Sequence, residues 1–218
     1  MGDYLSAAPV ASFIFALTVA WSLFAFSNEN LYGRFMLHPY SVSRREHVYT
    51  LITSGFIHKD WGHLFFNMFS FYIFAFTLEA GNPTSGIPAL GHWQFGVLYI
   101  VSMVLSDLPS VAKHRNDYWY HSLGASGAIS GVVFSFILFS PMTGMGIIFI
   151  PFFIPAIIFG PLYLIYCSYA SKYSRDNINH DAHFYGALSG LLLTLALKPG
   201  ILPLFIHQVS DAIQSLLH

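Results

Sequence analysis

Charged side chains are scarce in this sequence. Asp, Glu, Lys and Arg make up only 9% of its 218 residues, whereas 55% of the residues are hydrophobic. An ordinary soluble domain carries roughly a quarter charged residues. A soluble fold cannot hide this much apolar surface, so the composition excludes that class and indicates a membrane protein.

Other absences narrow the functional class. The single cysteine, Cys167, excludes an intramolecular disulfide. A formal net charge of -1 and the lack of a basic run argue against nucleic acid as a partner. No Lys or Arg precedes Arg34, so the chain begins without the positive n-region of a cleaved signal peptide. We therefore expect residues 9–28 to form a retained first span.

Long blocks without charge define the expected spans, because a membrane-crossing helix needs about 20 mostly apolar residues. The longest block, residues 118–171, is divided by the turn residues around Pro141 and Gly144 and is taken as two helices. The sequence thus predicts an all-α, polytopic membrane protein: one domain, residues 1–218, forming a six-transmembrane-helix bundle. The spans are expected at about 9–28, 61–79, 91–107, 124–140, 146–170 and 183–201.

Two further segments have distinct patterns. The first loop, residues 29–60, is longer than typical connections and mixes charges with aromatic residues, so we expect it to be structured and to lie partly among lipid headgroups. In residues 204–217, apolar side chains recur at helical spacing opposite polar ones. This pattern predicts an amphipathic tail helix at the membrane interface.

Polar residues at membrane depth are costly, so their positions are informative. His63 and Asn67 share one face at the start of the second expected span. Hydrogen bonding between helices would explain this pair equally well.

Small-residue motifs open the fourth and sixth spans. Ser126 directly precedes Gly127 and Gly131, a spacing that allows two helices to approach closely. Taken alone, this is a packing motif with an incidental serine. His183 shares a face with Gly186 and Gly190, and by itself it could be an interfacial histidine.

The three motifs gain meaning together, because the second, fourth and sixth spans run in the same direction and all three motifs lie at N-terminal ends. They therefore meet at one membrane face. There His183 can act as general base toward the Ser126 hydroxyl. The Ser126 amide, in the first turn of its helix, can bind an oxyanion, and His63 and Asn67 can supply further donors.

At this point the sequence resembles the rhomboid intramembrane serine proteases, over about Pro39 to Gly190. The resemblance implies a Ser126–His183 dyad, an oxyanion site with His63 and Asn67, and no metal or other cofactor. It also implies transmembrane protein substrates, cleaved near helix-destabilising segments after passing the fifth span. The likeness is carried by residues 124–127, by His183 with Gly186 and Gly190, and by His63 with Asn67 after residues 54–58. The glycines expected to pack the helices at the site are Gly124, Gly127, Gly131, Gly186 and Gly190, and the candidate gate residues are Phe152, Phe153 and Ile154.

Two positions depart from the family pattern. The family often has Tyr or Phe four residues after the serine, stacked on the histidine, whereas this sequence has Ser130. The orientation of the imidazole must then come from elsewhere, and an aromatic residue such as Tyr118 or Tyr120 is one candidate. In the first loop the family's Trp-Arg is replaced by residues 32–34, with Arg34 as a possible equivalent.

Orientation in the membrane is a point of conflict. Eight cations lie in the loops at the active face and only Lys198 at the other, so the positive-inside rule places the active face in the cytoplasm. The family resemblance implies the reverse for a six-span protein of the cell (inner) membrane. We expect an extracytoplasmic active face, because the first loop can owe its cations to its own structure.

Three other functions are open to this sequence. A non-catalytic rhomboid-like protein that binds or routes membrane clients would keep the glycine faces, but such relatives typically lose the serine or histidine. A channel or transporter predicts charges deep within spans. A metal hydrolase could use His180, Asp181 and His183, although no further ligand is evident.

Overall fold

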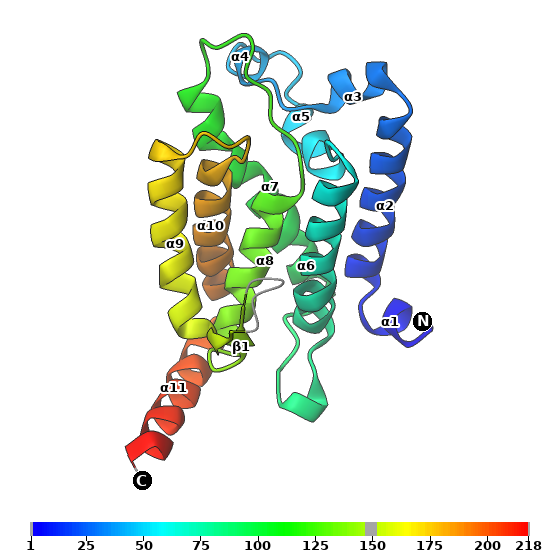
Figure 1. The fold of residues 1–218 in the computed structure, drawn as a ribbon. Coiled ribbons are helices and arrows are strands. Elements are labelled where there is room, and N and C mark those ends of the chain that lie inside the picture. Colours follow the sequence, from blue (N-terminus) through cyan, green and yellow to red (C-terminus); the bar gives the residue numbers. More distant parts are fainter. Residues whose placement is uncertain (1, 147–151, 218) are drawn as a thin grey trace.

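The computed structural model describes residues 2–146 and 152–217, and these residues are mostly helical (Figure 1). Helices lie at every position where the sequence predicts a span. They are α2 (Pro9–Phe26), α6 (Trp61–Ala80), α7 (His92–Lys113), α8 (Ser126–Phe139), α9 (Ala156–Tyr173) and α10 (His180–Leu197). The short α1 (Gly2–Ala7) precedes α2, and α11 (Ile201–Leu217) follows α10.

Length and hydropathy identify α2, α6 and α7 as able to cross a membrane. A fourth crossing exists if α10 and α11, which bend by 110° relative to each other, form one broken span. Helix α8 is apolar but has only 14 residues. The fold is thus a helical membrane fold, and the count of six crossings stays a prediction.

The fifth expected span begins at Ala156 rather than at residue 146, and this boundary prediction was wrong. Before the helix, strand β1 (Gly144–Met145) pairs antiparallel with strand β2 (Ile154–Pro155). Pro155 is the N-cap residue of α9, a position where its missing N–H removes no hydrogen bond of the helix. Phe152 and Phe153 precede β2 and are exposed, while residues 147–151 lie outside the described residues. The gate assignment stays a prediction.

Two other boundaries also differ from the prediction. Helix α7 runs to Lys113, well past the expected end at residue 107, so Asp107 lies within the helix and not at its end. Helix α10 ends at Leu197, and the tail helix begins at Ile201. The break falls at Lys198, whose backbone leaves the helical region because Pro199 follows it.

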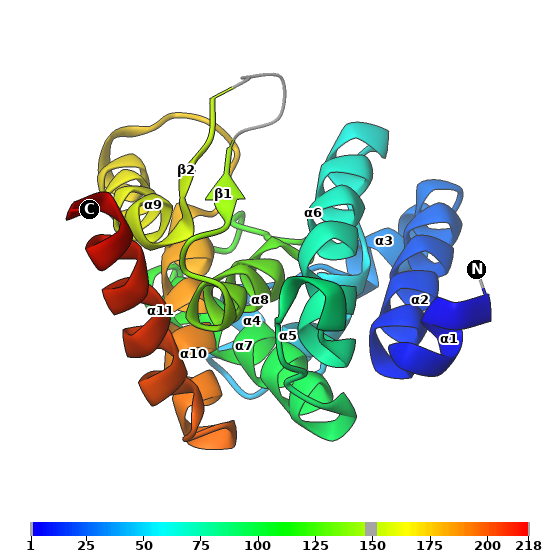
Figure 2. The same ribbon diagram turned by 90° about the horizontal axis from the view of Figure 1, so that it is seen from below.

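Helix α8 lies in the middle of the bundle, surrounded by neighbouring helices (Figure 2). Most of its side chains are buried, from Gly127 to Phe139. Beside it, Phe71 of α6 packs edge-on against Phe95 and Tyr99 of α7, and all three rings are fully buried. The serine that opens α8 is therefore carried by a helix that is buried along most of its length.

A buried carboxylate joins the far ends of three helices. Glu79, fully buried near the end of α6, accepts hydrogen bonds from the backbone N–H groups of Val10 and Ala11 at 3.0 and 2.6 Å. These groups lie in the first turn of α2, where they have no partner within the helix. Nδ1 of His92, the first residue of α7, is 2.7 Å from the same carboxylate.

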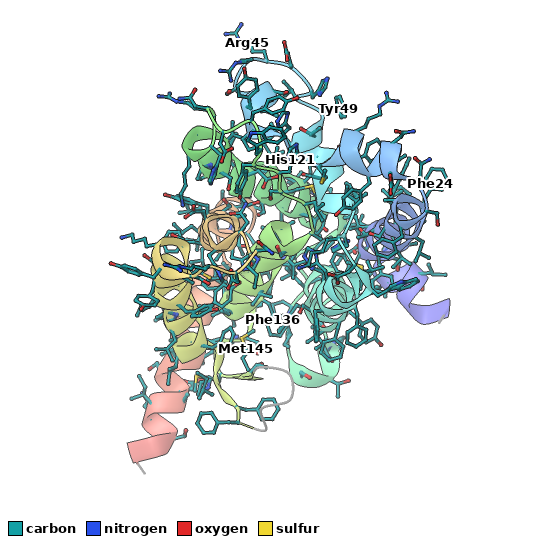
Figure 3. All side chains as sticks on the ribbon, turned by 45° about the horizontal axis from the view of Figure 1, so that its top comes forward. Phe24, Arg45, Tyr49, His121, Phe136 and Met145 are labelled. Atoms are coloured by element: carbon teal, nitrogen blue, oxygen red, sulfur yellow. The ribbon has the colours of Figure 1, made fainter. Side chains whose placement is uncertain are left out.

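The first loop is folded into α3 (Glu29–Phe35), α4 (Pro39–Val42), α5 (Thr50–Thr53) and the 3-10 helix η1 (Ser54–Phe56). These elements cover the end of the bundle at which α6, α8 and α10 begin (Figure 1). Figure 3 places Arg45, Tyr49 and His121 at this end, away from Phe136 and Met145. The second 3-10 helix, η2 (Pro83–Ser85), lies between α6 and α7.

Candidate active site

The backbone before Ser126 is fixed by the first loop. Gly124 has φ +116°, a conformation that favours glycine, and its N–H donates to the Ser54 carbonyl at 2.9 Å. The His63 ring packs against it so closely that a Cβ at this position would lie 2.8 Å from His63 Nε2. Ser126 then begins α8, where its amide has no intrahelical partner.

The glycine faces of α8 and α10 are in direct backbone contact. A Cβ added to Gly186 would collide with the Gly127 carbonyl, and one added to Gly190 would collide with the Gly131 carbonyl. Ser126 precedes Gly127 by one residue, and His183 precedes Gly186 by three, one turn of helix. The contact expected from the sequence therefore exists, and it brings the first turns of the two helices together.

Ser126 and His183 line one cavity of about 1080 Å³. His63, Asn67 and Gly124 line it as well, so the residues singled out in the sequence share one space. Loop residues also border it, including the exposed Lys59 and Asp60. A cavity with charged groups at its border can admit water to the serine.

His63 and Asn67 occupy successive turns of α6, as their spacing predicts. Asn67 Nδ2 donates to the His63 carbonyl at 2.9 Å, which leaves the second amide hydrogen available. His63 Nδ1 is buried and has no hydrogen-bond partner within the described residues. Asp60 is the N-cap residue of α6, because its carboxylate accepts a hydrogen bond from the His63 amide at 2.7 Å. His63 and Asn67 both line the cavity, and each keeps unused hydrogen-bonding capacity.

His58 is a site residue to which the sequence assigns no role. Its Nδ1 lies 2.9 Å from Ser22 Oγ, and its Nε2 accepts from the Ala125 N–H at 3.4 Å. Burial lowers the pKa of His58 from 6.5 to about 3, because the charged imidazolium is disfavoured without water. The neutral ring links α2 to the residue that precedes Ser126.

The ring that lies beside His183 comes from α9. Tyr163 and His183 have nearly parallel rings, with 16° between the planes and 6.5 Å between the centroids. The Tyr163 hydroxyl lies 3.1 Å from Ser130 Oγ. Position 130, where the family often has an aromatic residue, thus carries a serine. Its hydroxyl contacts Tyr163, and the ring of Tyr163 lies beside His183. Nothing in the spacing of Tyr163 links it to a histidine on another helix.

The suggested partners of His183 were wrong. Tyr120 stacks on His114, with the ring centroids 3.6 Å apart, and Tyr118 packs against Tyr40. Both residues lie in the segment that leads into α8, and their rings are held by loop neighbours.

The suggested metal triple is not assembled either. Asp181 pairs with Lys113 at 2.6 Å instead of facing the two histidines.

Asn179 caps α10 by accepting a hydrogen bond from the Ala182 N–H at 3.0 Å, and its side-chain NH₂ group donates to the hydroxyls of Ser110 and Ser122. These contacts tie the start of α10 to α7 and to the segment before α8.

Comparison with known proteins shows the family of this chain. The Rhomboid domain family model matches residues 45–200, well over half of the chain. A protein of Bacillus subtilis (strain 168), named "Putative rhomboid protease YdcA", is 28% identical over 191 residues, covering 85% of this chain and 87% of that protein. This chain therefore belongs to the rhomboid family of intramembrane serine proteases.

Proposed function

We propose that this protein hydrolyses peptide bonds of transmembrane proteins within the membrane, with Ser126 as nucleophile and His183 as general base. The single observation that carries the proposal is the backbone contact between Gly127 and Gly186, which brings the helix starts bearing these two residues to one cavity. A serine hydroxyl is a weak nucleophile until an adjacent base accepts its proton.

In the first step, Ser126 Oγ attacks the scissile carbonyl carbon while His183 accepts the hydroxyl proton. The imidazolium then donates that proton to the leaving amine, and an acyl-enzyme remains. Water from the cavity attacks the ester, again with His183 as base. His183 then returns its proton to Ser126 Oγ as the ester bond breaks, so that the dyad regains its starting state. One product ends in a new carboxylate and the other begins with a new amine.

The oxyanion formed in each step needs fixed donors. The Ser126 amide lies in the first turn of α8, where the helix dipole is positive. Asn67 has one amide hydrogen left after its bond to the His63 carbonyl, and His63 Nδ1 is unpartnered within the described part of the chain. Removing one such donor typically costs about 10² to 10³ in rate.

Substrate access is proposed between α6 and α9. On this side the cavity is lined by Phe66 and Phe74 of α6 and by Phe159 of α9. Apolar walls suit a substrate helix that arrives from lipid. Unwinding of the substrate next to Ser126 is required, because a helical backbone does not expose its carbonyl carbon to attack.

We propose that the protein lies in the cell membrane with this active face outside the cytoplasm. Two cations at this face, Arg44 in the first loop and Lys113 at the end of α7, have structural roles that account for their presence there. Arg44 donates to the carbonyls of Tyr40 and Arg115 and lies 3.6 Å from the centre of the Tyr40 ring, and Lys113 pairs with Asp181. Tags on both termini should be shielded from added protease in sealed right-side-out membranes.

Cleavage of a model transmembrane substrate by purified protein tests the proposal. Ser126→Ala and His183→Ala should each abolish cleavage while remaining folded. Ser135→Ala is the matched control, because Ser135 lies on the same helix and accepts a hydrogen bond from Thr194 at 2.6 Å, remote from the cavity lining. The control should cleave at close to the wild-type rate. If Ser126→Ala cleaves as fast as wild type, the dyad assignment is wrong.

A non-catalytic, client-binding rhomboid is the alternative outcome. It predicts that folded wild type binds transmembrane helices yet cleaves no member of a varied substrate panel. A fluorophosphonate probe, which reacts with activated serines, would then leave Ser126 unlabelled.

A further inference from the structure

A second cluster of reactive side chains lies beside the dyad. Cys167 of α9 and His180 and His183 of α10 present a sulfur and two ring nitrogens that all lie within 4.8 Å of one another. Cys167 is fully buried and His180 is 4% exposed. Neither side chain has a part in the proposed hydrolysis.

His180 is already arranged as a metal ligand would be. Its Nε2 lies 3.1 Å from one carboxylate oxygen of Asp176, while its Nδ1 is buried and has no hydrogen-bond partner within the described residues. A buried polar atom without a partner is costly. Ligating histidines commonly donate their other N–H to a carboxylate, which fixes the ring and the tautomer.

Asp176 is suited to that supporting role. The Asp176 carboxylate is held in place by a hydrogen bond from the Ile178 N–H at 3.1 Å, in addition to its contact with His180. The His180 ring stands nearly perpendicular to the His183 ring, with 80° between the planes and 5.9 Å between the centroids. The two rings are thus neighbours in different planes, and each offers a nitrogen to the group of ligand atoms that lie within 4.8 Å of one another.

We infer that Cys167, His180 and His183 form a binding site for a thiophilic divalent cation of the zinc class, and that occupation of this site reversibly switches off the protease. A thiolate and two imidazoles are a usual ligand set for zinc, with bonds of about 2.3 Å to sulfur and 2.0–2.1 Å to nitrogen. Such bond lengths place ligand atoms roughly 3.5 Å apart around a tetrahedral ion. Small side-chain rotations close the set onto an ion.

An ion can reach the cluster from the active-site cavity. His183 lines that cavity, as do Asp176 and Asn179 on the α9–α10 connection. Water from the cavity can occupy the fourth position. Binding deprotonates the Cys167 thiol and releases one proton to solvent, with no change in oxidation state.

The inhibitory effect follows from the chemistry of imidazole and rests on the proposed function. Neutral imidazole has one nitrogen with a free lone pair, while the other carries the proton. If a cation takes the lone pair of His183, the remaining nitrogen is N–H and cannot accept a proton from Ser126. The bound ion thus removes the general base without touching the serine.

Cobalt absorption tests the site independently of proteolysis. Co²⁺ added to chelator-treated protein in detergent should give a thiolate-to-cobalt charge-transfer band. Cys167 is the only cysteine in the sequence, so such a band can come from no other thiol. Cys167→Ala should lose the band entirely, and His180→Gln should weaken it strongly. Lack of the band in folded wild type would overturn the inference, whatever the protease activity.

Zinc titration of substrate cleavage tests the switch. Zn²⁺ should inhibit wild type, and excess chelator should restore its rate. Cys167→Ala should keep its metal-free rate and resist zinc. Asp176→Asn should raise the zinc concentration for half-inhibition by roughly 10–100-fold, the usual cost of losing such a supporting carboxylate. His207→Gln, which alters an exposed His–Asp pair on α11, is the control and should respond like wild type.

The outcomes separate the two proposals. A cobalt band in a protein that cleaves no substrate would contradict the proposed protease and leave the metal site standing. Equal zinc inhibition of wild type and Cys167→Ala would overturn the switch.

Discussion

The ring of Tyr163 on α9 lies nearly parallel to the ring of His183 on α10, 6.5 Å from centroid to centroid. Ser130 of α8 holds the tyrosine hydroxyl at 3.1 Å. The proposed base is therefore flanked by a helix other than the one that carries the serine. We assign Tyr163 as a positioning residue.

Tyr163→Leu should lower kcat by roughly 10–100-fold with little change in KM, because a misplaced catalytic group can cost about 10² in rate. Tyr163→Phe keeps the ring and should retain activity within about tenfold of wild type. Steady-state kinetics on one model substrate distinguish the two. Tyr169→Leu changes an exposed tyrosine of the same helix and should behave as wild type. Equal losses in the Leu and Phe variants would contradict a role for the ring.

The glycine contact gives a second prediction. Gly186→Ala places a methyl group on the Gly127 carbonyl, so the helices must separate. We expect loss of cleavage and a destabilisation of about 1–3 kcal/mol or more, as overpacking usually causes. Thermal unfolding in mild detergent measures the second effect. At Gly33 a Cβ meets nothing within 4 Å, so Gly33→Ala should leave both properties unchanged.

The sequence predicts this contact well, and the reason is physical. Glycine spacing on α8 and α10 directly determines which faces can approach, and Ser126 and His183 lie on those faces. The position of Tyr163 follows instead from how α9 packs against its neighbours, and no local pattern encodes that packing. The late start of α9 was missed for a related reason. The apolar segment before α9 contains the β1–β2 pairing, and composition does not distinguish such a segment from a span.

Glu79 should be essential for stability. Its carboxylate accepts from two backbone amides of α2 and pairs with His92. Glu79→Gln removes the charge and turns an NH₂ group toward the backbone donors of α2, and the loss of hydrogen bonds to a charged group typically costs about 1.5–3 kcal/mol each. The variant should unfold at a clearly lower temperature. Glu29→Gln, at the exposed start of α3, should shift the unfolding temperature little.

Acid should weaken the protein through His58. The pKa of this group is about 3 in the folded chain against 6.5 in the unfolded chain. Between these values the unfolded state binds more protons, so the stability contributed by neutral His58 falls as pH drops from about 6.5 toward 3. The slope is at most about 1.4 kcal/mol per pH unit.

His58→Gln removes this titration. The unfolding temperature of the variant should therefore change less between pH 7 and pH 5 than that of wild type. A wild-type profile with the same pH dependence as the variant would show that His58 is not buried as a neutral ring.

Sequence reasoning and structure differ most where loops meet the site. The positions of the candidate dyad and oxyanion residues on α6, α8 and α10 could be predicted from helical periodicity. His58 and Asn179 act through hydrogen bonds to segments distant in sequence, such as the Ala125 amide and the Ser122 hydroxyl. Only the folded chain reveals these partners. The residues that could react were therefore identifiable from the sequence, whereas several of those that hold them were not.

The most direct test of the central claim is to identify the serine that reacts with a fluorophosphonate probe, by mass spectrometry of the folded, detergent-solubilised protein. Wild type should carry the label on Ser126, and labelling should be lost or greatly slowed in His183→Ala, because the hydroxyl then has no base. Labelling of another serine, or equally fast labelling of Ser126 in His183→Ala, would contradict the Ser126–His183 dyad.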